Sequence, residues 1–288
     1  MMTQLMDGKA TARRVEEDVK QRIVTLKERG KRTPNLSVVI VGDLPASMSY
    51  VAGKEKACQR VGMNSEVLHI PRTISQAELI KIVQRLNEDT KVDGILIQLP
   101  LPAELDAQEI VRTIDPLKDV DGLHPINVGK MHMQIKGFEP CTPRGIIRLL
   151  DEYQIPLQGK DVVVIGRSNL VGRPIAQLLL NRNATVTVCH SKTADLHRYT
   201  RAADVIIVAI GRPYFLKKDH VSLKATVIDV GINRLENGKL VGDADFEAMN
   251  GYVSHLTPVP GGVGPMTIAM LLENTMDAYF EHESHREV

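Results

Sequence analysis

A lysine interrupts the apolar face of the helix that the sequence predicts over residues 45–61. Val51, Lys54, Cys58 and Val61 follow the i, i+3, i+7, i+10 spacing of a single helix face. A lysine in such a place either extends along the apolar surface to reach water, or is held for chemistry with a depressed pKa. The spacing alone leaves both interpretations open, and the second would make Lys54 a proton-transfer group.

Tyr50, Gln98 and two aspartates could complete a site around this lysine. Tyr50 lies four residues before Lys54, so the ring and the amine can project into one pocket; the alternative is an aromatic at the edge of the core with its hydroxyl in water. Gln98 interrupts an apolar strand at its carboxyl end, where α/β sheets bind ligands, and a buried amide there needs a partner. Asp119 and Asp121 follow in a polar loop, where solvation or helix capping is an equal alternative to chemistry.

A second group of residues has the pattern of a phosphate-binding turn. The predicted strand over residues 162–165 runs into Gly166-Arg167-Ser168, and Gly172 then precedes a helical segment over residues 175–180. Gly166 permits a tight turn, Gly172 permits close packing of the helix on the strand, and exposed N–H groups at the helix start attract phosphate. The spacing departs from G-x-G-x-x-G, so a plain strand-to-helix turn remains the alternative.

The end of the next predicted strand indicates which dinucleotide would bind. A carboxylate is expected there for a ribose 2′-hydroxyl, but the chain reads Cys189-His190-Ser191-Lys192. A hydroxyl beside cations, with Arg167 available from the first turn, suits a 2′-phosphate that a carboxylate would repel. This pattern favours NADP over NAD, and the alternative is a solvated polar loop.

Alternating strands and helices must position these residues. Short β-branched runs separated by helical periodicity predict βαβ units and parallel sheets in both halves of the chain. We therefore expect an α/β protein of two α/β domains with a cleft between them, the second Rossmann-like, and a junction between about Asp121 and Thr142. The expected strands are 36–41, 66–70, 94–99, 161–165, 185–188, 205–208 and 226–230, and the expected helices are 11–29, 45–61, 76–87, 105–114, 175–180 and 266–279, followed by a solvated tail over 281–288.

Composition excludes several classes of protein. The 288 residues are 43% hydrophobic and 25% charged, which is typical of a globular protein, and the formal net charge of +1 argues against nucleic acid as the main partner. No long apolar run predicts a membrane helix or a signal peptide, so we expect a cytoplasmic protein without a membrane partner. The three separated cysteines predict reduced thiols and no metal site.

Five blocks of sequence together resemble a known family. In order along the chain they are Tyr50-Val51-Ala52-Gly53-Lys54, residues 93–102, Lys118-Asp119-Val120-Asp121-Gly122, Gly166-Arg167-Ser168 and residues 258–267. With these blocks the chain is similar over nearly its whole length to the bifunctional methylenetetrahydrofolate dehydrogenase/methenyltetrahydrofolate cyclohydrolases of the FolD type. The resemblance implies NADP-dependent oxidation of 5,10-methylenetetrahydrofolate to the 5,10-methenyl cation, and hydrolysis of that cation to 10-formyltetrahydrofolate in the same cleft.

The resemblance also implies roles for individual residues. Lys54 matches a general acid/base of the hydrolysis, Gln98 a neighbour that tunes it, Tyr50 a ring that stacks on the folate, and Asp121 an acid that binds the pterin. The catalytic set is thus Lys54, Gln98 and Tyr50, and the tetrahydrofolate-binding set is Tyr50, Gln98, Leu99, Asp121, Gly262 and Pro265. The implied NADP-binding set is Gly166, Arg167, Ser168, Gly172, His190, Ser191 and Ile232.

The family further implies how the chain is divided and assembled. Residues 1–139 would form the folate-binding domain, completed by a C-terminal helix over 266–288, with residues 140–265 as the NADP-binding domain. A homodimer is expected from the resemblance only. Two other functions remain as alternatives: a dehydrogenase that uses Lys54 on a different small substrate, and a non-catalytic protein that binds NADP.

Overall fold

The chain divides into two compact units, each with its own sheet. The computed structural model describes residues 2–286. The small-sheet unit comprises Arg13–Cys141 and the residues from Ile268 onward, and the large-sheet unit comprises Thr142–Thr267 and the residues before Arg13. The predicted α/β class and the presence of two domains are confirmed, but the first twelve residues lie with the large sheet and not with the small one. The reason is that β1 (Gln4–Leu5) pairs with β11 (His255–Leu256).

The small-sheet unit is built on three parallel strands. β2 (Asn35–Val41) lies between β3 (Asn64–Ile70) and β4 (Gly94–Ile97). One face packs on helices α3 (Gln76–Glu88) and α4 (Ala107–Thr113) through a buried apolar cluster, and α2 (Pro45–Val61) contacts β2 and β3. From β2 the chain continues to β3 on one side and later to β4 on the other side, so the strand order reverses between β2 and β4. Open α/β sheets bind ligands at the carboxyl ends of the strands beside such a reversal.

Local sequence signals set the ends of these helices. Pro45 occupies the first turn of α2, where its missing N–H costs nothing, and Gly62 ends the helix at φ 76° in the left-handed region. Ser75 and Glu78 form a reciprocal capping box at the start of α3. The helix that carries Lys54 therefore has the predicted bounds, because Pro45 marks its start and Gly62 marks its end.

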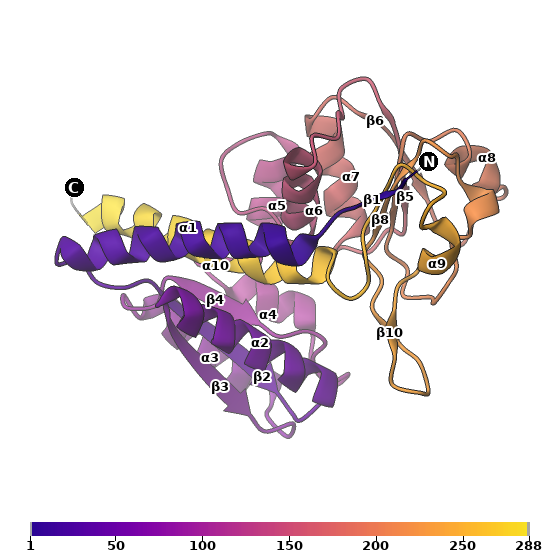
Figure 1. Ribbon diagram of the computed structural model, residues 1–288. Coiled ribbons are helices and arrows are strands. Elements are labelled where there is room, and N and C mark those ends of the chain that lie inside the picture. The colour runs from indigo at the N-terminus through magenta and orange to yellow at the C-terminus, as the bar shows by residue number, and fades with distance from the viewer. Residues whose placement is uncertain (1, 287–288) are drawn as a thin grey trace. The chain divides into compact units, whose positions relative to one another are not determined.

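The C-terminal helix is part of the small-sheet unit. From Ile268 onward, α10 (Val263–Arg286) lies beside α1 (Gly8–Glu28), and Arg22 forms an ion pair with Asp277 between them (Figure 1). The expectation of a solvated tail over residues 281–288 was wrong for residues 281–286, which continue α10, and residues 287–288 lie outside the described part of the chain. His282 contacts the buried carboxylate of Asp93 at 3.2 Å, and Arg32 binds that carboxylate with two hydrogen bonds of 2.7 and 2.6 Å.

The large-sheet unit is a six-stranded parallel sheet. Its order is β6-β5-β7-β8-β11-β1, so the chain order changes direction between β5 and β7, as in a Rossmann-like fold. Its other strands are β5 (Asp161–Ile165), β6 (Thr185–Cys189), β7 (Val205–Val208) and β8 (Thr226–Asp229). Its helices are α6 (Cys141–Glu152, whose first residue lies in the other unit), α7 (Gly172–Asn181), α8 (Leu196–Thr200) and α9 (Phe246–Met249), with a 3-10 turn at Lys218–His220 and a small hairpin of β9 (Asn233–Arg234) and β10 (Leu240–Val241).

Two expectations about elements differ from the structure. The strand expected over 94–99 ends at Ile97, because the chain turns at Gln98 ahead of a cis peptide bond between Leu99 and Pro100. The stretch expected to be a junction contains a helix, α5 (Pro125–His132), in which the N–H of Ile126 donates to the His124 side chain that caps it. Across residues 2–286 no helix is both long enough and apolar enough to span a bilayer.

Candidate functional site

Lys54 is buried and paired with Gln98. The lysine is 9% exposed, and its Nζ donates a 2.9 Å hydrogen bond to Oε1 of Gln98. The amide nitrogen of Gln98 donates to the carbonyl of Leu99 at 2.7 Å, and its backbone N–H donates to Val39. The structure therefore excludes the interpretation in which Lys54 extends to water. It also supplies the partner that the amide of Gln98 was expected to need.

The charge around Lys54 is set by burial and two acidic neighbours. Burial lowers the pKa of Lys54, because the charged ammonium loses its hydration, and Asp121 and Cys141 oppose this shift in part. Burial likewise raises the pKa of Asp121, against the attraction of Lys54 and a hydrogen bond from Cys141. These three side chains and Gln98 form what we call the Lys54 cluster. Because the pKa of Lys54 is lowered and that of Asp121 is raised, this group can hold a proton or transfer it to a ligand.

Other residues expected in this site lie around α2 and β4. Tyr50 is on α2, four residues before Lys54, and is 45% exposed, so its ring face is accessible to a ligand. Leu99 is half-buried directly after Gln98. The sequence associates Tyr50, Gln98 and Asp121 with Lys54 but gives no indication of Cys141. A lone cysteine far along the chain carries no spacing signal, and only the fold brings it to Asp121.

Asp119 makes no hydrogen bond to the side chains of the Lys54 cluster among the described contacts. It is buried, and its carboxylate accepts hydrogen bonds from the backbone N–H groups of Leu123 and His124 just before α5. Asp119 is therefore neither solvated nor the N-cap of α5, which is His124, but binds the loop that leads into that helix, whereas Asp121 interacts with Lys54 and Cys141. Lys118 is also structural, since its Nζ donates to three backbone carbonyls at the C-terminal end of α3.

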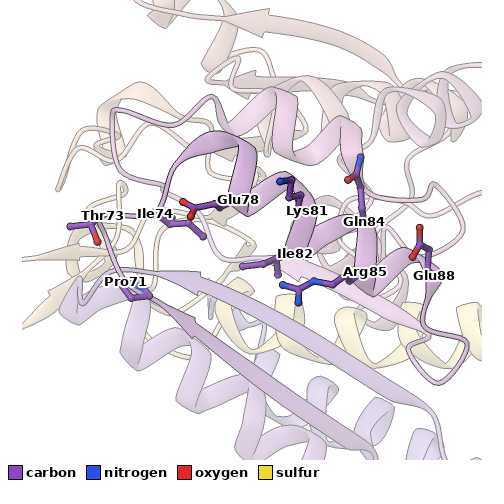
Figure 2. A pocket seen from close by; sticks show the side chains of 9 residues that line it. All are labelled: Pro71, Thr73, Ile74, Glu78, Lys81, Ile82, Gln84, Arg85 and Glu88. Carbon is purple, nitrogen blue, oxygen red and sulfur yellow. The ribbon is translucent and has the colours of Figure 1, made fainter.

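A separate hollow lies on the outer side of α3. Figure 2 shows Lys81, Arg85 and Glu88 from α3 along it, with Pro71 and Thr73 from the segment that follows β3. None of the residues of the Lys54 cluster lines it. This surface is therefore distinct from the chemical site.

In the large-sheet unit, two glycines bring α7 close to the end of β5. Gly166 has φ 122°, which favours glycine, and a Cβ there would overlap the carbonyl oxygen of Ala209 at the end of β7. A Cβ on Gly172 would overlap the carbonyl oxygen of Gly166. The predicted tight turn and close packing are both present, and they lie where the strand order of the sheet changes direction.

One expectation about this turn was wrong. The N–H groups of Val171 and Gly172 donate to Oγ of Ser168, and the N–H of Arg173 donates to its carbonyl. Residue 174 is proline and has no N–H. The first-turn amides are thus already bonded to Ser168. The groups left to attract phosphate are the helix dipole, the Ser168 hydroxyl as a donor and the exposed cationic side chain of Arg167.

The remaining residues expected to contact a nucleotide border the same edge of the sheet. His190 follows β6 and closes a turn in which its Nδ1 accepts from the N–H of Lys192, while Ser191 is exposed. Ile232 follows β8 and is 43% exposed. All follow the carboxyl ends of parallel strands, the edge at which open α/β sheets bind nucleotides.

Gly262 and Pro265 differ in what they can contact. Gly262 is buried, and its carbonyl lies where a Cβ on Gly8 would be, so the structure gives it a packing role at the start of α1. Pro265 is half-buried in the first turn of α10. Pro265 therefore has surface that a ligand could touch, and Gly262 supports the loop that leads to it.

Two buried aspartates that sequence analysis missed organise the loops after β7 and β8. Asp243 accepts hydrogen bonds from the N–H groups of Ile210, Gly211 and Arg212, and Asp229 accepts from Gly231, Asp243 and Ala244. Burial raises the pKa of Asp229 to about 7. Within residues 2–286, no group of three His, Cys, Asp or Glu side chains is arranged to hold a metal ion.

Both units of the chain match models of the same protein family. Residues 6–121 match the family model described as tetrahydrofolate dehydrogenase/cyclohydrolase, catalytic domain, and residues 140–283 match its NAD(P)-binding domain. The chain is 56% identical to the bifunctional protein FolD of Campylobacter hominis over 273 residues, covering 95% of this chain and 96% of the relative. It is 50% identical to the Bacillus subtilis protein of the same name over 276 residues, covering 96% and 97%.

Solved structures agree with these matches. The Campylobacter jejuni FolD methylenetetrahydrofolate dehydrogenase/cyclohydrolase superimposes with a TM-score of 0.95 at 52% identity, covering 97% of this chain and 99% of that one. The Trypanosoma brucei enzyme, complexed with NADP and an inhibitor, gives a TM-score of 0.94 at 36% identity, with 98% of each chain covered.

Proposed function

Because the chain belongs to the tetrahydrofolate dehydrogenase/cyclohydrolase family, we propose that it carries out both of that family's reactions. It oxidises 5,10-methylenetetrahydrofolate to the 5,10-methenyl cation with NADP, and it hydrolyses the cation to 10-formyltetrahydrofolate. The observation that carries this proposal is the buried Lys54–Gln98 pair, in a chain that also has a glycine-lined Rossmann-like turn.

The residues at the end of β5 fit a dinucleotide phosphate. Gly166 and Gly172 let the turn pack closely against the end of β7 and the start of α7, at the edge of the sheet where a pyrophosphate would bind, and the Ser168 hydroxyl can donate to it. No carboxylate follows β6, where His190 and Ser191 occur instead, and Arg167 supplies a cation for a 2′-phosphate. We therefore assign NADP as the cofactor. When bound, it supplies the hydride acceptor for the oxidation.

Tetrahydrofolate would be held by the residues around the Lys54 cluster. The exposed ring of Tyr50 offers a stacking surface for the pterin, and Asp121 offers a carboxylate to its ring N–H donors. Leu99, directly after Gln98, presents half-buried apolar surface to the folate. Pro265, in the large-sheet unit, is a further folate contact only by the family resemblance. These residues orient the substrate, and the protein contributes to the oxidation chiefly through that orientation.

Lys54 is proposed to move the proton in the hydrolysis. Its burial favours the neutral amine, which can take a proton from the water that adds to the methenyl carbon. The new ammonium then gives its proton to N5 as the bond between N5 and that carbon breaks. The hydroxyl of the adduct loses its proton to the regenerated amine as the carbonyl forms, which leaves the formyl group on N10, and Lys54 releases this proton to water. Oε1 of Gln98 accepts an N–H bond from the amine throughout, so the nitrogen lone pair is aimed away from the amide.

We further propose that the protein acts as a homodimer in the cytoplasm. The outer edge of β3 pairs with no strand among the described residues, and an open edge of seven residues is a surface that a second copy can extend. The hollow along α3 begins directly after that strand (Figure 2). All three cysteines are buried and free, which is consistent with a reducing compartment. Light scattering of the purified chain tests the dimer.

The test of the function is a turnover assay with purified protein. Protein is mixed with 5,10-methylenetetrahydrofolate and NADP, with NAD in a parallel sample, and the absorbance of the reduced nicotinamide is followed. Formation of NADPH well above the NAD rate, followed by loss of added methenyl cation faster than without protein, is the expected result. No reduction with either cofactor by folded protein would contradict the proposal and would favour a different substrate or a non-catalytic binding role.

A further inference from the structure

Asp119 is a buried carboxylate with no part in the proposed chemistry. It is 1% exposed and lies two residues before Asp121. Its oxygens accept hydrogen bonds from the backbone N–H groups of His124 at 2.8 Å and Leu123 at 3.2 Å. These bonds close residues 119–124 into a loop. Asp121 is inside that loop, so the path of its backbone depends on the bonds that Asp119 makes.

Asn127, in the first turn of α5, donates a hydrogen bond to the same carboxylate. It is buried, and its Nδ2 donates to Oδ2 of Asp119 at 2.8 Å and to the carbonyl of Pro116 at 2.9 Å. Its Oδ1 is buried and has no hydrogen-bond partner among the described residues. A buried amide oxygen without a partner costs free energy, so the donor end is the useful part of this side chain. Asn127 therefore stabilises Asp119 in its ionised form.

The residues on either side of Asp121 are anchored as well. The carbonyl of Val120 accepts bonds from Sγ of Cys141 at 3.3 Å and Nδ2 of Asn274 at 2.8 Å. Gly122 has φ 69°, and a Cβ there would lie 2.5 to 2.7 Å from the backbone of Glu139 and Pro140. Lys118 is fixed at the end of α3, as described above. Asp121 lies between these anchored residues, and its carboxylate interacts with both Lys54 and Cys141.

We propose that Asp119 is a positioning residue for the binding of the folate substrate. Its hydrogen bonds hold the loop of residues 119–124, so that the Asp121 carboxylate stays against Lys54 and the pterin. This inference rests on the proposed function. Asp119 acts through Asp121 and does not touch the substrate. Burial of the Asp119 carboxylate raises its pKa to about 7, so its network is weakest in acid, when the carboxyl group is protonated.

The experiment compares three variants with the wild-type protein. In Asp119→Asn, the amide oxygen can replace only one of the two carboxylate oxygens, so the new NH2 group faces the N–H of Leu123, or those of His124 and Asn127, and those bonds are lost. Asn127→Ala is a milder change that leaves Asp119 in place and removes one of its donors. The matched control is Asp106→Asn, because Asp106 caps α4 with bonds to the N–H groups of Gln108 and Glu109 and is remote in sequence from the loop. KM for 5,10-methylenetetrahydrofolate and KM for NADP are measured for each.

We expect the KM for the folate to rise about tenfold in Asp119→Asn and about threefold in Asn127→Ala, since small displacements of a binding group cost large factors. KM for NADP should stay within about twofold in both variants, and Asp106→Asn should change neither constant. A purely structural role for Asp119 would leave the two KM values unchanged, or raise them together, in folded protein, and that result would overturn the inference. If Asp119→Asn does not fold, Asn127→Ala alone decides. An inactive wild-type protein would overturn the proposed function itself, whereas an active one with unaffected variants would overturn only this inference.

Discussion

Nζ of Lys54 and the amide oxygen of Gln98 are joined by a 2.9 Å hydrogen bond across 44 residues of sequence. The amide orientation is fixed from its other side, because Nε2 donates to the carbonyl of Leu99 at 2.7 Å. An oxygen that faces the lysine accepts from either the ammonium or the neutral amine, so it does not force a charge on Lys54. This arrangement leaves the pKa of Lys54 to be set mainly by burial, which lowers it.

Replacing Gln98 by glutamate should shift the pH dependence of the hydrolysis. A carboxylate beside Lys54 stabilises the ammonium, so the pKa of the lysine rises and less of it is a free base at neutral pH. We expect hydrolysis at pH 7 to fall at least about tenfold, with the rising limb of the rate profile moved to higher pH. The profile is measured from the loss of methenyl absorbance.

The matched control for this variant is Gln84→Glu, on the exposed side of α3. It adds the same charge far from the Lys54 cluster in sequence and should leave the profile where it is. An unchanged profile in Gln98→Glu would mean that Lys54 is not the titrating base.

Replacing Gly172 by alanine should weaken cofactor binding. The new methyl group would overlap the backbone of Gly166, so α7 must move away from the end of β5. We expect a loss of about 1–3 kcal/mol in the free energy of unfolding, together with a weaker Kd for NADP. Thermal unfolding and a fluorescence titration with NADP measure the two effects.

Gly129→Ala is the control, because nothing lies within 4 Å of a Cβ at Gly129, and it should stabilise the fold by about 0.5–1 kcal/mol. NADP affinity equal to wild type in Gly172→Ala would contradict the proposed site.

Stability should depend on pH through Asp229. Its pKa is raised to about 7 by burial, so between pH 4 and 7 the folded chain binds more protons than the unfolded chain does. Its contribution to stability is therefore present in acid and is lost as pH rises through about 7. Asp229→Asn removes that titration. The wild-type free energy of unfolding minus that of the variant should fall between pH 5 and 8, as followed by urea denaturation. A difference that is constant or grows with pH would contradict the assignment.

The sequence was sufficient where the signal is local. The bounds of α2 follow from Pro45 and Gly62, and its face of Val51, Lys54, Cys58 and Val61 is buried as the spacing predicts. The turn at Gly166 is likewise readable, because a strand, two glycines and a helix occur in one short run. Helix α5 was missed because it is only eight residues long and lies in a stretch rich in proline and glycine.

The sequence was insufficient where the partner is remote. His282 and Asp93 are 189 residues apart, so the charged end of α10 resembled a solvated tail until the fold brought it to the buried carboxylate. Hydrogen bonds from Arg32 and His282 hold the pKa of Asp93 below its usual value, although burial alone would raise it. The same holds for Asp243, whose three backbone donors lie in a loop more than thirty residues earlier. No periodicity in the chain records such contacts.

The most direct test of the account is Lys54→Met, with both activities measured on one preparation. Methionine has a similar length and fits a buried site, so the fold should be kept, with a loss of about 1–3 kcal/mol because Oε1 of Gln98 loses its donor. We expect hydrolysis of the methenyl cation to drop by about a hundredfold or more, and NADP-dependent oxidation to remain measurable. Hydrolysis that persists at the wild-type rate, or equal loss of both activities in folded protein, would contradict the assignment of Lys54 as the group that moves the proton.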